Sequence, residues 1–366
     1  MKQRFLQTLG VSLPILQAPM AGISSPAMAA AVSAAGGLGA LAIGAMGVAQ
    51  ARDAIGAFKR ACARPLNVNV FVHRAPVACA SREVRWLDHL RPEFERWRAR
   101  PPEALRSPYV SFLHDAAMCA MLVEERPRVV SFHFGLPDQS QIEALRSSGI
   151  VLIATATNLA EAQAIERAGL DAIVAQGVEA GGHRGVFDPD ADDLQLGIMA
   201  LTRLLAQNVS LPIIAAGGIM DGAGIAAALA LGACAAQLGT AFVATDESLA
   251  DAAYRERLLG SDACNTVITR AISGRPARGL PNDFTRLGAT IADADIPDYP
   301  LAYHAGKALH AAAMAAGYSG YGAHWAGQGA PLARTMSAGS LVRTLAHEMM
   351  EACDDVCVAN RQGELG

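Results

Sequence analysis

Lysine is nearly absent from this sequence. Lys2, Lys59 and Lys307 are the only three lysines in 366 residues, although arginine is plentiful, and the formal net charge is −4. A chain without excess positive charge lacks the basic surface that binds nucleic acid and the polybasic segment that is attracted to anionic membranes. Small anions must therefore be held by local groups, so each lysine is a candidate for such a role.

Paired cysteines are also lacking. The seven cysteines are an odd number at scattered positions, and no Cys-x-x-Cys pair occurs. This pattern indicates neither a disulfide framework nor a zinc site. We therefore expect a protein of the reducing cytoplasm that uses no metal.

A membrane span is not indicated either. Residues 11–51 carry no charged side chain and are long enough to cross a bilayer. However, Pro14, Pro26 and several glycines interrupt them, and alanine is commoner there than leucine. Gln7 and Gln17 likewise break the apolar centre that a secretion signal would need. Buried strands and helices of a soluble core explain the segment better.

Apolar residues, in contrast, make up 52% of the chain and charged residues only 17%. This is enough for a sizeable core in one large domain, or in one large and one small domain. Eight apolar runs alternate with helix-like stretches and read as parallel strands buried on both faces. The alternation predicts an α/β fold, a closed (β/α)8 TIM barrel, with an open doubly wound sheet as the alternative. The expected strands are Pro14–Met20, Gly37–Gly44, Pro65–Phe71, Val129–Gly135, Val151–Thr157, Ala172–Gly177, Pro212–Gly218 and Ala235–Phe242.

Polar residues mark where three of the helices begin. Ser25 followed by Pro26 predicts a capped helix with proline in its first turn. Asn158 with Glu161 three residues later is similar to a capping box. Asp221 precedes a third helical stretch, which the sequence predicts it to cap.

Two regions fall outside the repeat of the barrel, which we expect to occupy residues 1–260. Residues 73–108 are too long for a simple loop, so they are expected to cover the barrel mouth and to end at Tyr109, which opens a helix. Residues 261–330 continue without a further strand–helix period and are assigned to a small, mainly helical second domain that covers the substrate. Residues 331–366 are expected to form a helical segment that returns to the barrel.

The most distinctive stretch is Ala175–Gly185, a glycine-rich turn that follows a predicted strand and carries one imidazole. Gly181, Gly182 and Gly185 allow the backbone to take positive φ or to approach a ligand closely. His183 stands among them. The stretch indicates the floor of a cofactor site with a functional side chain above it, and a plain loop with a solvated histidine is the alternative.

The loops after the seventh and eighth strands predict a phosphate site. The first contains Gly217 and Gly218, and the second contains Gly239 and Thr240. TIM barrels commonly hold a phosphate between these two loops. Backbone N–H groups at the glycines and the Thr240 hydroxyl are suited to bind a phosphate monoester.

A competing motif follows directly. Gly222–Ala227 fits a relaxed dinucleotide fingerprint, with Asp246 near the required distance. However, Asp221 would place a carboxylate where the pyrophosphate should lie. A dinucleotide domain normally begins with its fingerprint unit, whereas several strand–helix units precede this one. We therefore do not expect a dinucleotide here.

Polar side chains also gather on the expected catalytic face. Tyr299, Tyr303 and Lys307 recur every four residues and so share one face of a helix whose first turn holds Pro300. Two phenols and an ammonium group make a donor-rich surface for a small dianion, and an ordinary amphipathic face is the alternative. His133, at the end of the fourth strand, is either a core histidine or a second imidazole facing the substrate.

Several segments carry a family resemblance: Gln17–Gly22, Ser33–Gly39, Glu179–Gly185 and Ala215–Ile219, with extensions into Tyr299–Lys307 and Trp325–Gln328. Together they closely resemble the class I nitronate monooxygenases, formerly called 2-nitropropane dioxygenases. The resemblance implies an FMN-binding barrel with a small lid domain. It further implies oxidation of alkyl nitronates, notably propionate 3-nitronate, with molecular oxygen and no metal.

The resemblance also implies roles for single residues. His183 would be the catalytic residue beside the reactive edge of the isoalloxazine ring. The nitronate and its carboxylate would be surrounded by His133, Tyr109, Tyr299, Tyr303 and Lys307. FMN would be bound by Met20, Asn69, Gln176, Gly181, Gly217, Gly218, Gly239, Thr240 and Gln328, with its phosphate at Gly218, Gly239 and Thr240.

A nitronate is already a carbanion equivalent, so no strong base is needed. One electron passing to FMN would give a flavin semiquinone and a substrate radical, with which oxygen would combine. His183 is expected to be cationic or to donate a hydrogen bond to the nitro group. Neutral nitroalkanes would need it as a general base and are expected to be poor substrates.

Three other functions remain open from the sequence. An NADH-dependent FMN reductase of the enoyl-acyl carrier protein or quinone type would share the barrel and the Gly-Gly-His turn. However, the Tyr299–Lys307 face favours a small acidic substrate, and Arg184 after the histidine fits the nitronate group better. A metal-free aldolase or isomerase would hold a substrate phosphate in the glycine loops, and a binding protein would do no chemistry. The expected partners are a small anionic nitronate and O2, with no nucleic acid and no membrane, and the protein is expected to be a monomer or homodimer.

Overall fold

The computed structural model describes residues 2–363, with side chains described for residues 4–354. The last three residues of the expected C-terminal segment, 364–366, lie outside the described residues. No helix among residues 2–363 combines the length and the apolar character needed to cross a bilayer.

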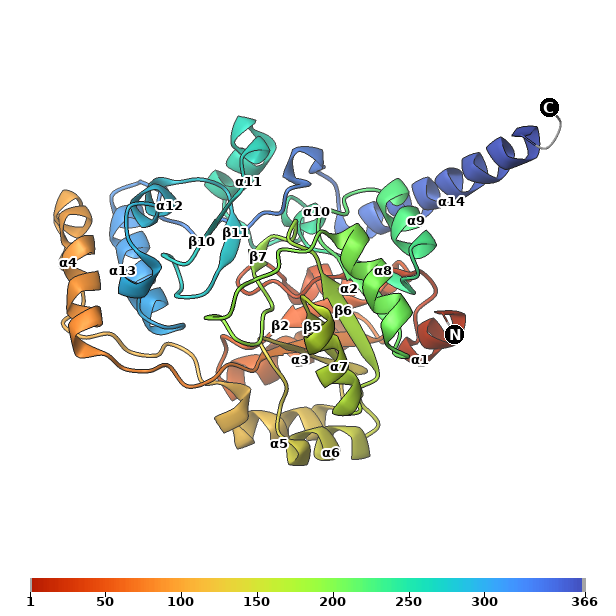
Figure 1. The fold of residues 1–366 in the computed structure, drawn as a ribbon, viewed down its shortest axis with the longest axis horizontal. Helices are drawn as coiled ribbons and strands as arrows, with labels where there is room; N and C mark the ends of the chain where they lie inside the picture. The colour runs from red at the N-terminus through yellow and green to blue at the C-terminus, as the bar shows by residue number, and fades with distance from the viewer. Residues whose placement is uncertain (1, 364–366) are drawn as a thin grey trace.

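Eight parallel strands form a barrel in the centre of the molecule (Figure 1). Their hydrogen-bonded order is β1-β9-β8-β6-β5-β4-β3-β2. The ring closes between its two ends, because the Gln17 N–H donates to the Leu38 carbonyl at 2.9 Å and the Leu38 N–H donates to the Ile15 carbonyl at 3.0 Å. The predicted closed barrel is therefore confirmed and the open sheet is excluded. The strands are β1 (Ile15–Gln17), β2 (Gly39–Ala42), β3 (Leu66–Phe71), β4 (Val129–His133), β5 (Val151–Ala156), β6 (Ala172–Gln176), β8 (Ile213–Ala216) and β9 (Ala235–Leu238).

Helices between the strands surround the barrel. The three predicted caps are confirmed, because Ser25 Oγ accepts from the Met28 N–H, Asn158 Oδ1 from the Glu161 N–H, and Asp221 Oδ1 from the Gly224 N–H. Each cap satisfies a donor that the first helical turn leaves free. The helices are α2 (Pro26–Ala34), α3 (Val48–Ala61), α5 (Ala116–Glu125), α6 (Gln139–Ser147), α7 (Leu159–Arg167), α8 (Ile198–Asn208) and α9 (Gly222–Ala230).

Two predicted boundaries are wrong. The last strand ends at Leu238, since the short helix α10 (Thr240–Val243) follows at once. Tyr109 does not open a helix. The next helical turn is η1 (Phe112–His114), and α5 begins after Asp115, whose side chain accepts from the Met118 N–H and so fixes the helix start.

The amino-terminal end of the barrel is covered by α1 (Lys2–Leu9). Phe5 and Leu9 are buried in one apolar cluster with Val129, Val151 and other residues near the starts of the strands. This end of the barrel is therefore filled by side chains, and a ligand has room only at the opposite, carboxyl end.

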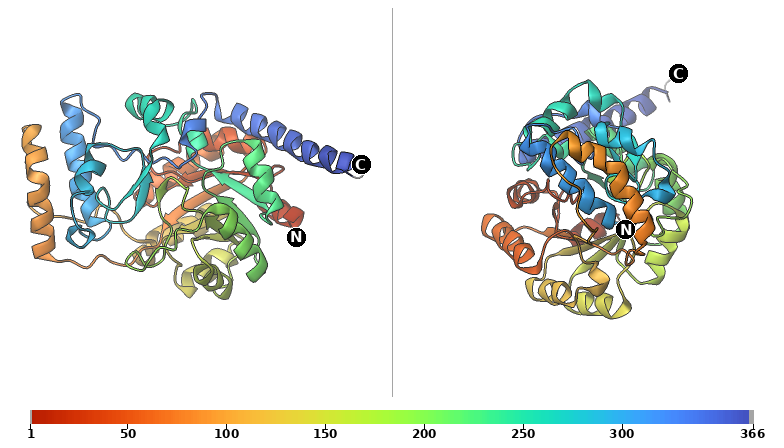
Figure 2. Two further views of the ribbon diagram at one scale, coloured as in Figure 1. Left: turned by 45° about the horizontal axis from the view of Figure 1, so that its top comes forward. Right: turned by 90° about the vertical axis from the view of Figure 1, so that its left-hand side faces the viewer.

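The carboxyl end lies under a cover made from two separate parts of the sequence. The insertion contributes α4 (Ala80–Arg96), which lies beside α13 (Leu301–Ala315) far from the barrel (Figures 1 and 2). Trp86, Leu90 and Leu309 are fully buried in the core that they share. The remaining elements of the cover are α11 (Ala252–Leu259), η2 (Ser261–Cys264), α12 (Asp283–Gly288), η3 (Asp293–Asp295) and η4 (Ala330–Leu332).

A small antiparallel sheet joins this cover to the barrel. It consists of β10 (Val267–Thr269), β11 (Ala277–Gly279) and the two-residue strand β7 (Gly182–His183). The sequence did not predict β7, because two residues are too few for a periodic signal. As a result, the histidine of the glycine-rich turn is paired directly with Ala277 of the cover.

The chain ends in α14 (Ala338–Gly363), which packs against α2 and α9. Leu341, Val342 and Leu345 enter a buried cluster together with residues of these two helices. Beyond this contact the helix extends away from the barrel (Figure 1). At the start of α9, the Glu348 side chain of α14 accepts from the Gly222 N–H at 2.9 Å.

Candidate active site

A cavity of about 580 Å³ lies at the carboxyl ends of the strands, beneath the cover. It brings together nearly all of the residues that the sequence assigned to a site. Gln328 is the exception, since its side chain is exposed and does not line the cavity. Its backbone N–H donates instead to the Glu179 carbonyl at 2.9 Å. The lining includes Met20, Asn69, Tyr109, His133, Gln176, Gly181, His183, Gly217, Gly218, Gly239, Thr240, Tyr299, Tyr303 and Lys307.

The glycine-rich turn is held from beneath by Gln176, the last residue of β6. Its Nε2 donates to the His183 carbonyl at 3.0 Å, and its Oε1 accepts from the Gly185 N–H at 2.7 Å. From above, the turn pairs with β11. His183 is therefore fixed from both sides before any ligand is present.

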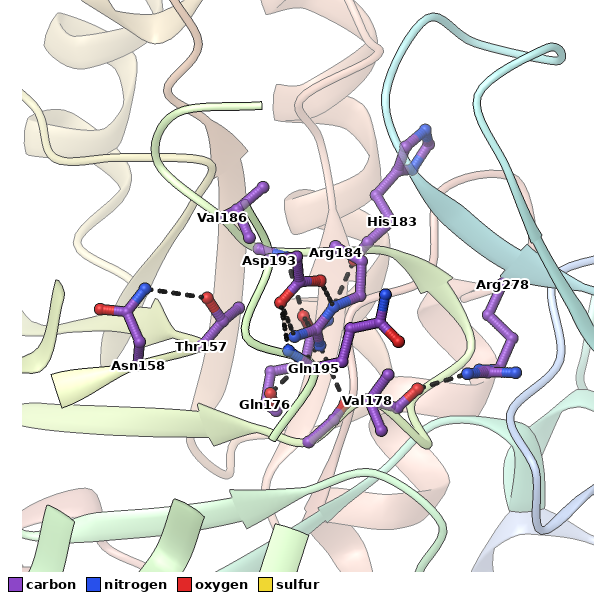
Figure 3. A network of polar contacts seen from close by, with 12 residues as sticks. Thr157, Asn158, Gln176, Val178, His183, Arg184, Val186, Asp193, Gln195 and Arg278 are labelled. Carbon is purple, nitrogen blue, oxygen red and sulfur yellow. Dashed lines mark hydrogen bonds and ion pairs between the residues drawn. The ribbon is translucent and has the colours of Figure 1, made fainter. Parts of the chain in front are cut away.

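Arg184 points away from His183, into the body of the protein (Figure 3). Its side chain is completely buried, forms an ion pair with Asp193 at 2.6 Å, and donates to the Gly177 carbonyl at 3.0 Å. Successive residues of a strand face opposite sides, so a residue next to His183 cannot share its cavity. Arg184 therefore supports the turn and does not line the cavity.

The ring of His183 lies among aromatic side chains. Its centroid is 5.3 Å from Trp325, 5.5 Å from Phe134 and 5.6 Å from Tyr299. Burial and, to a smaller extent, nearby His133 and Arg275 lower the pKa of His183 to about 3. The imidazole of the free protein is therefore neutral at neutral pH, and the cationic form considered from the sequence is disfavoured.

His133 lines the same cavity, but both of its ring nitrogens bind protein atoms. Nδ1 lies 3.1 Å from Thr155 Oγ1, and Nε2 lies 3.2 Å from the His183 carbonyl oxygen. A carbonyl only accepts, so Nε2 carries the proton and Nδ1 accepts from the threonine. Burial lowers the pKa of His133 to about 4. His133 thus holds the backbone of residue 183 and offers no free nitrogen to a ligand.

Tyr109, Tyr299, Tyr303 and Lys307 meet on the cover side of the cavity. Tyr299 precedes α13 and is not on its helical face, contrary to the prediction, but its ring still lies 6.4 Å from that of Tyr109. Burial raises the pKa of all three phenols, to about 12 for Tyr303. They remain protonated at neutral pH and can donate hydrogen bonds.

Lys307 lies against these rings rather than against an acid. Its Nζ is 4.6 Å from the ring centroid of Tyr109 and 5.1 Å from that of Tyr303, within the range of a cation–π contact. No carboxylate of the described residues pairs with it. Burial lowers the pKa of its ammonium group. The cation is therefore available to an anion in the cavity.

Sequence reasoning did not assign Phe134, Ser273, Arg275 or Trp325 to the site. Phe134 has φ +80° directly after β4, a strained conformation that aims its ring between the two histidines. Ser273 and Arg275 belong to Ser273–Gly279, whose concentration of glycine, proline and arginine before a strand was the available signal. Contacts this distant in sequence are not visible to local patterns.

The two glycine loops form a corner suited to phosphate. Gly217 and Gly218 have φ +129° and +69°, which L side chains rarely adopt. Among the described residues, no acceptor is bonded to the backbone N–H groups of Gly218, Gly239 and Thr240. The Thr240 hydroxyl accepts from the Gly327 N–H at 3.0 Å and so ties this corner to the cover. Free N–H groups at glycines and at a helix start are typical of an anion site.

In the competing dinucleotide motif, carboxylates already bind the backbone N–H groups at the start of the helix. Asp221 caps α9, and the Glu348 carboxylate accepts from the Gly222 N–H at 2.9 Å. Two carboxylates at this helix end exclude a pyrophosphate by charge and by space.

Comparisons with known proteins show which family the chain belongs to. The family model described as nitronate monooxygenase matches residues 2–348. A nitronate monooxygenase of Paraburkholderia phytofirmans is 57% identical over 97% of this chain and 97% of its own length. One of Pseudomonas aeruginosa is 52% identical over 95% of this chain and 99% of its own length.

Solved structures share the fold. The structure of a nitroalkane oxidase from Streptomyces ansochromogenes has a TM-score of 0.88 at 41% identity, covering 96% of this chain and 99% of that one. FabK from Thermotoga maritima has a TM-score of 0.76 at 29% identity, covering 97% and 98%. The chain therefore belongs to the nitronate monooxygenase family and is an oxidoreductase.

Proposed function

We propose that this protein oxidises nitronates with molecular oxygen, using FMN bound in the cavity, and that propionate 3-nitronate and alkyl nitronates are its substrates. The observation that carries the proposal is the convergence, in one cavity, of a phosphate corner with His183 and an unpaired Lys307. A ligand that has a phosphate at one end and reacts at the other matches this arrangement.

The residues fit FMN. Gly218, Gly239 and Thr240 would hold its phosphate through the N–H groups described above. Met20 and Asn69 line the cavity nearby, and Asn69 is held in place by donating to Ser131 Oγ at 3.0 Å. When bound, FMN supplies the redox chemistry that takes electrons from the nitronate, while the protein positions the reactants and controls access.

The substrate end of the cavity is built for an anion. Lys307 supplies a positive charge without a competing carboxylate, and Tyr109, Tyr299 and Tyr303 supply protonated hydroxyl groups. A carboxylated nitronate carries two negative charges, so it satisfies the ammonium and the phenols at once. The surrounding aromatic rings exclude water, which strengthens each of these interactions.

The alternative is an FMN enzyme that NADH reduces. Such an enzyme needs room for nicotinamide against the flavin, whereas Tyr299, Tyr303 and Trp325 surround His183 on the side of the cover. The rings that crowd His183, together with the nearby Lys307 ammonium group, therefore favour a small anion over a dinucleotide.

Oxygen consumption by the yellow, FMN-loaded protein tests the proposal. Propionate 3-nitronate should start oxygen uptake without NADH, and NADH should neither bleach the flavin under anaerobic conditions nor increase the rate. Prompt bleaching by NADH together with no uptake on nitronate would establish the reductase instead. A colourless protein that takes up no FMN would overturn both functions and leave the aldolase or isomerase.

A further inference from the structure

Ser273 lies between the catalytic imidazole and the loop that precedes β11. Its side chain is completely buried, and its Oγ is 2.9 Å from His183 Nε2. The same oxygen lies 3.2 Å from the Arg275 carbonyl oxygen and 3.3 Å from the Arg275 backbone nitrogen. One hydroxyl group therefore contacts three polar atoms, and its single proton can serve only one of them.

The available hydrogen-bond donors decide which atom receives the proton of the Ser273 hydroxyl group. If the hydroxyl donates to the Arg275 carbonyl, the oxygen accepts from the Arg275 N–H and from a protonated His183 Nε2. All three contacts are then hydrogen bonds. If it donates to His183 instead, the Arg275 carbonyl has no donor among the described residues. A buried carbonyl without a donor costs about 1–3 kcal/mol, so the first arrangement is favoured.

Arg275 also acts through its charge. The guanidinium is 2% exposed, lies 4.3 Å above the Phe134 ring, and donates to the Val186 carbonyl. No carboxylate of the described residues forms an ion pair with it, and its Nε has no partner. Glu161 acts on it only from a greater distance. A buried cation this close to His183 opposes a second positive charge there.

The other titratable groups around His183 do not favour an imidazolium either. From β4 comes neutral His133, from the segment leading into α13 comes the protonated phenol of Tyr299, and from α13 itself comes that of Tyr303. No carboxylate contacts the ring from the described elements. Nδ1 of His183 makes no hydrogen bond to a described residue, and it is not among the buried polar atoms that lack a partner.

We propose that Ser273 and Arg275 are positioning residues that hold His183 as the neutral tautomer with its proton on Nε2. Nδ1 is then the nitrogen that faces the cavity, and it is a hydrogen-bond acceptor. In this tautomer the imidazole has no N–H facing the cavity, so it cannot donate a hydrogen bond to an anion there.

The tautomer has a consequence for substrate binding, and this consequence rests on the proposed function. Nitronate oxygens only accept hydrogen bonds, so they match Nδ1 only after it has taken up a proton. The negative charge of the nitronate raises the pKa of the ring. Nitronate binding under anaerobic conditions should therefore draw a proton from the buffer. Calorimetry in buffers of different ionisation enthalpy detects this uptake.

Nitrogen-15 NMR of the FMN-loaded protein with labelled histidine tests the tautomer directly, without substrate. The His183 signals are identified by their loss in His183→Asn. Between pH 5 and pH 8 we expect a protonated Nε2, an unprotonated Nδ1 and no titration. Wild-type protein with its proton on Nδ1, or a ring that titrates near pH 6.5, would overturn the proposal.

Two pairs of variants separate positioning from general damage. Ser273→Ala should give a mixture of the two neutral His183 tautomers, and Ser273→Thr, which keeps the hydroxyl group, should restore the single tautomer. Thr155→Val is the control: it removes the hydroxyl group that contacts His133 and should leave the tautomer of His183 unchanged. Arg275→Met should raise the pKa of His183 by about one unit or more, which is measured by extending the NMR titration below pH 5. Arg278→Met is the matched control, since Arg278 is 6% exposed and bonds the Val178 carbonyl on the far side of the turn (Figure 3).

These measurements keep the two proposals apart. A wild-type tautomer as expected, with no binding of nitronate, would refute the proposed function and leave the tautomer standing. Equal pKa changes in Arg275→Met and Arg278→Met would show a general effect of lost charge and would refute the role of Arg275.

Discussion

The ammonium nitrogen of Lys307 lies 4.6 Å from the ring centroid of Tyr109, a residue almost two hundred positions earlier in the chain. Lys307 comes from α13 and Tyr109 from the end of the insertion, so this contact exists only because both parts of the cover close over the barrel. It leaves the cation supported by aromatic faces and free of carboxylates. Such a cation adds little to folding and is suited to bind an anion.

Lys307→Met should therefore damage the binding of carboxylated substrates selectively. Losing a charge-assisted hydrogen bond should raise KM for propionate 3-nitronate about 10- to 100-fold. Alkyl nitronates, which lack the carboxylate, should change far less. Steady-state oxygen uptake with both substrates measures the difference. Lys59→Met, which removes a surface ion pair with Glu125 and a hydrogen bond to its carbonyl, is the control. Equal effects of Lys307→Met on both substrate classes would contradict the proposed contact.

His183→Asn should remove turnover and keep the cofactor. The side chain faces the reacting end of the cavity, and loss of such a group typically lowers kcat by at least about 100-fold. The phosphate corner lies elsewhere, so the visible spectrum of bound FMN should persist. Exposed His89 provides the control, His89→Asn, which should be fully active. Wild-type kcat in His183→Asn would show that this histidine has no catalytic role.

Gly181→Ala should loosen the cover. An added Cβ would lie 2.6 Å from the Gly327 nitrogen and 2.7 Å from the Ala326 carbonyl carbon, and relieving this overlap requires the backbone to move. We expect a loss of about 1–3 kcal/mol in the free energy of unfolding and weaker FMN binding, because Gly327 also donates to Thr240. Denaturant titration and FMN fluorescence measure the two effects.

Gly56→Ala is the matched control for this substitution. Gly56 lies inside α3, where the new methyl group would meet only the flexible end of Arg60 at 3.3 Å. The unfolding free energy should rise by about 0.5–1 kcal/mol, because alanine is the better helix former. If both variants behaved alike, the close approach at Gly181 would not be a constraint.

Stability should fall as the pH drops below about 6.5. His183 and His133 have pKa values of about 3 and 4 in the folded protein. An unfolded imidazole takes up a proton near pH 6.5, so between these values the unfolded state binds more protons and the unfolding free energy decreases with decreasing pH. The loss is on the order of 1 kcal/mol per pH unit for each histidine.

Thermal unfolding between pH 5 and pH 8 measures this dependence. His133→Gln keeps an amide that can donate to the His183 carbonyl, and it should remove at most about a third of the slope, because burial also lowers the pKa of His324 to about 4. A Tm that does not change between pH 5 and pH 7 would show that the two imidazoles are not held neutral.

Much of the fold was predictable because its signals are local. All eight strands were recognisable as apolar runs, since a parallel strand buried on both faces needs no alternation. Ser25, Asn158 and Asp221 marked helix starts because a cap acts on backbone within three residues. The boundary errors, at Leu238 and Tyr109, fall where a short helix or a proline-bordered loop leaves no periodic pattern.

The sequence by itself determined the barrel, the two glycine loops and the position of His183 at the end of a strand, because each depends on residues that are neighbours in the chain. Only the tertiary structure decided the chemical state of that histidine. Ser273, which contacts His183, is 90 residues away in the sequence, so no local pattern reveals it as the partner of His183. Strand β7 has only two residues, so no local pattern shows that the Arg184 side chain points away from that of His183. Burial and hydrogen bonding set the protonation of a side chain, and both depend on which distant segments the fold brings together.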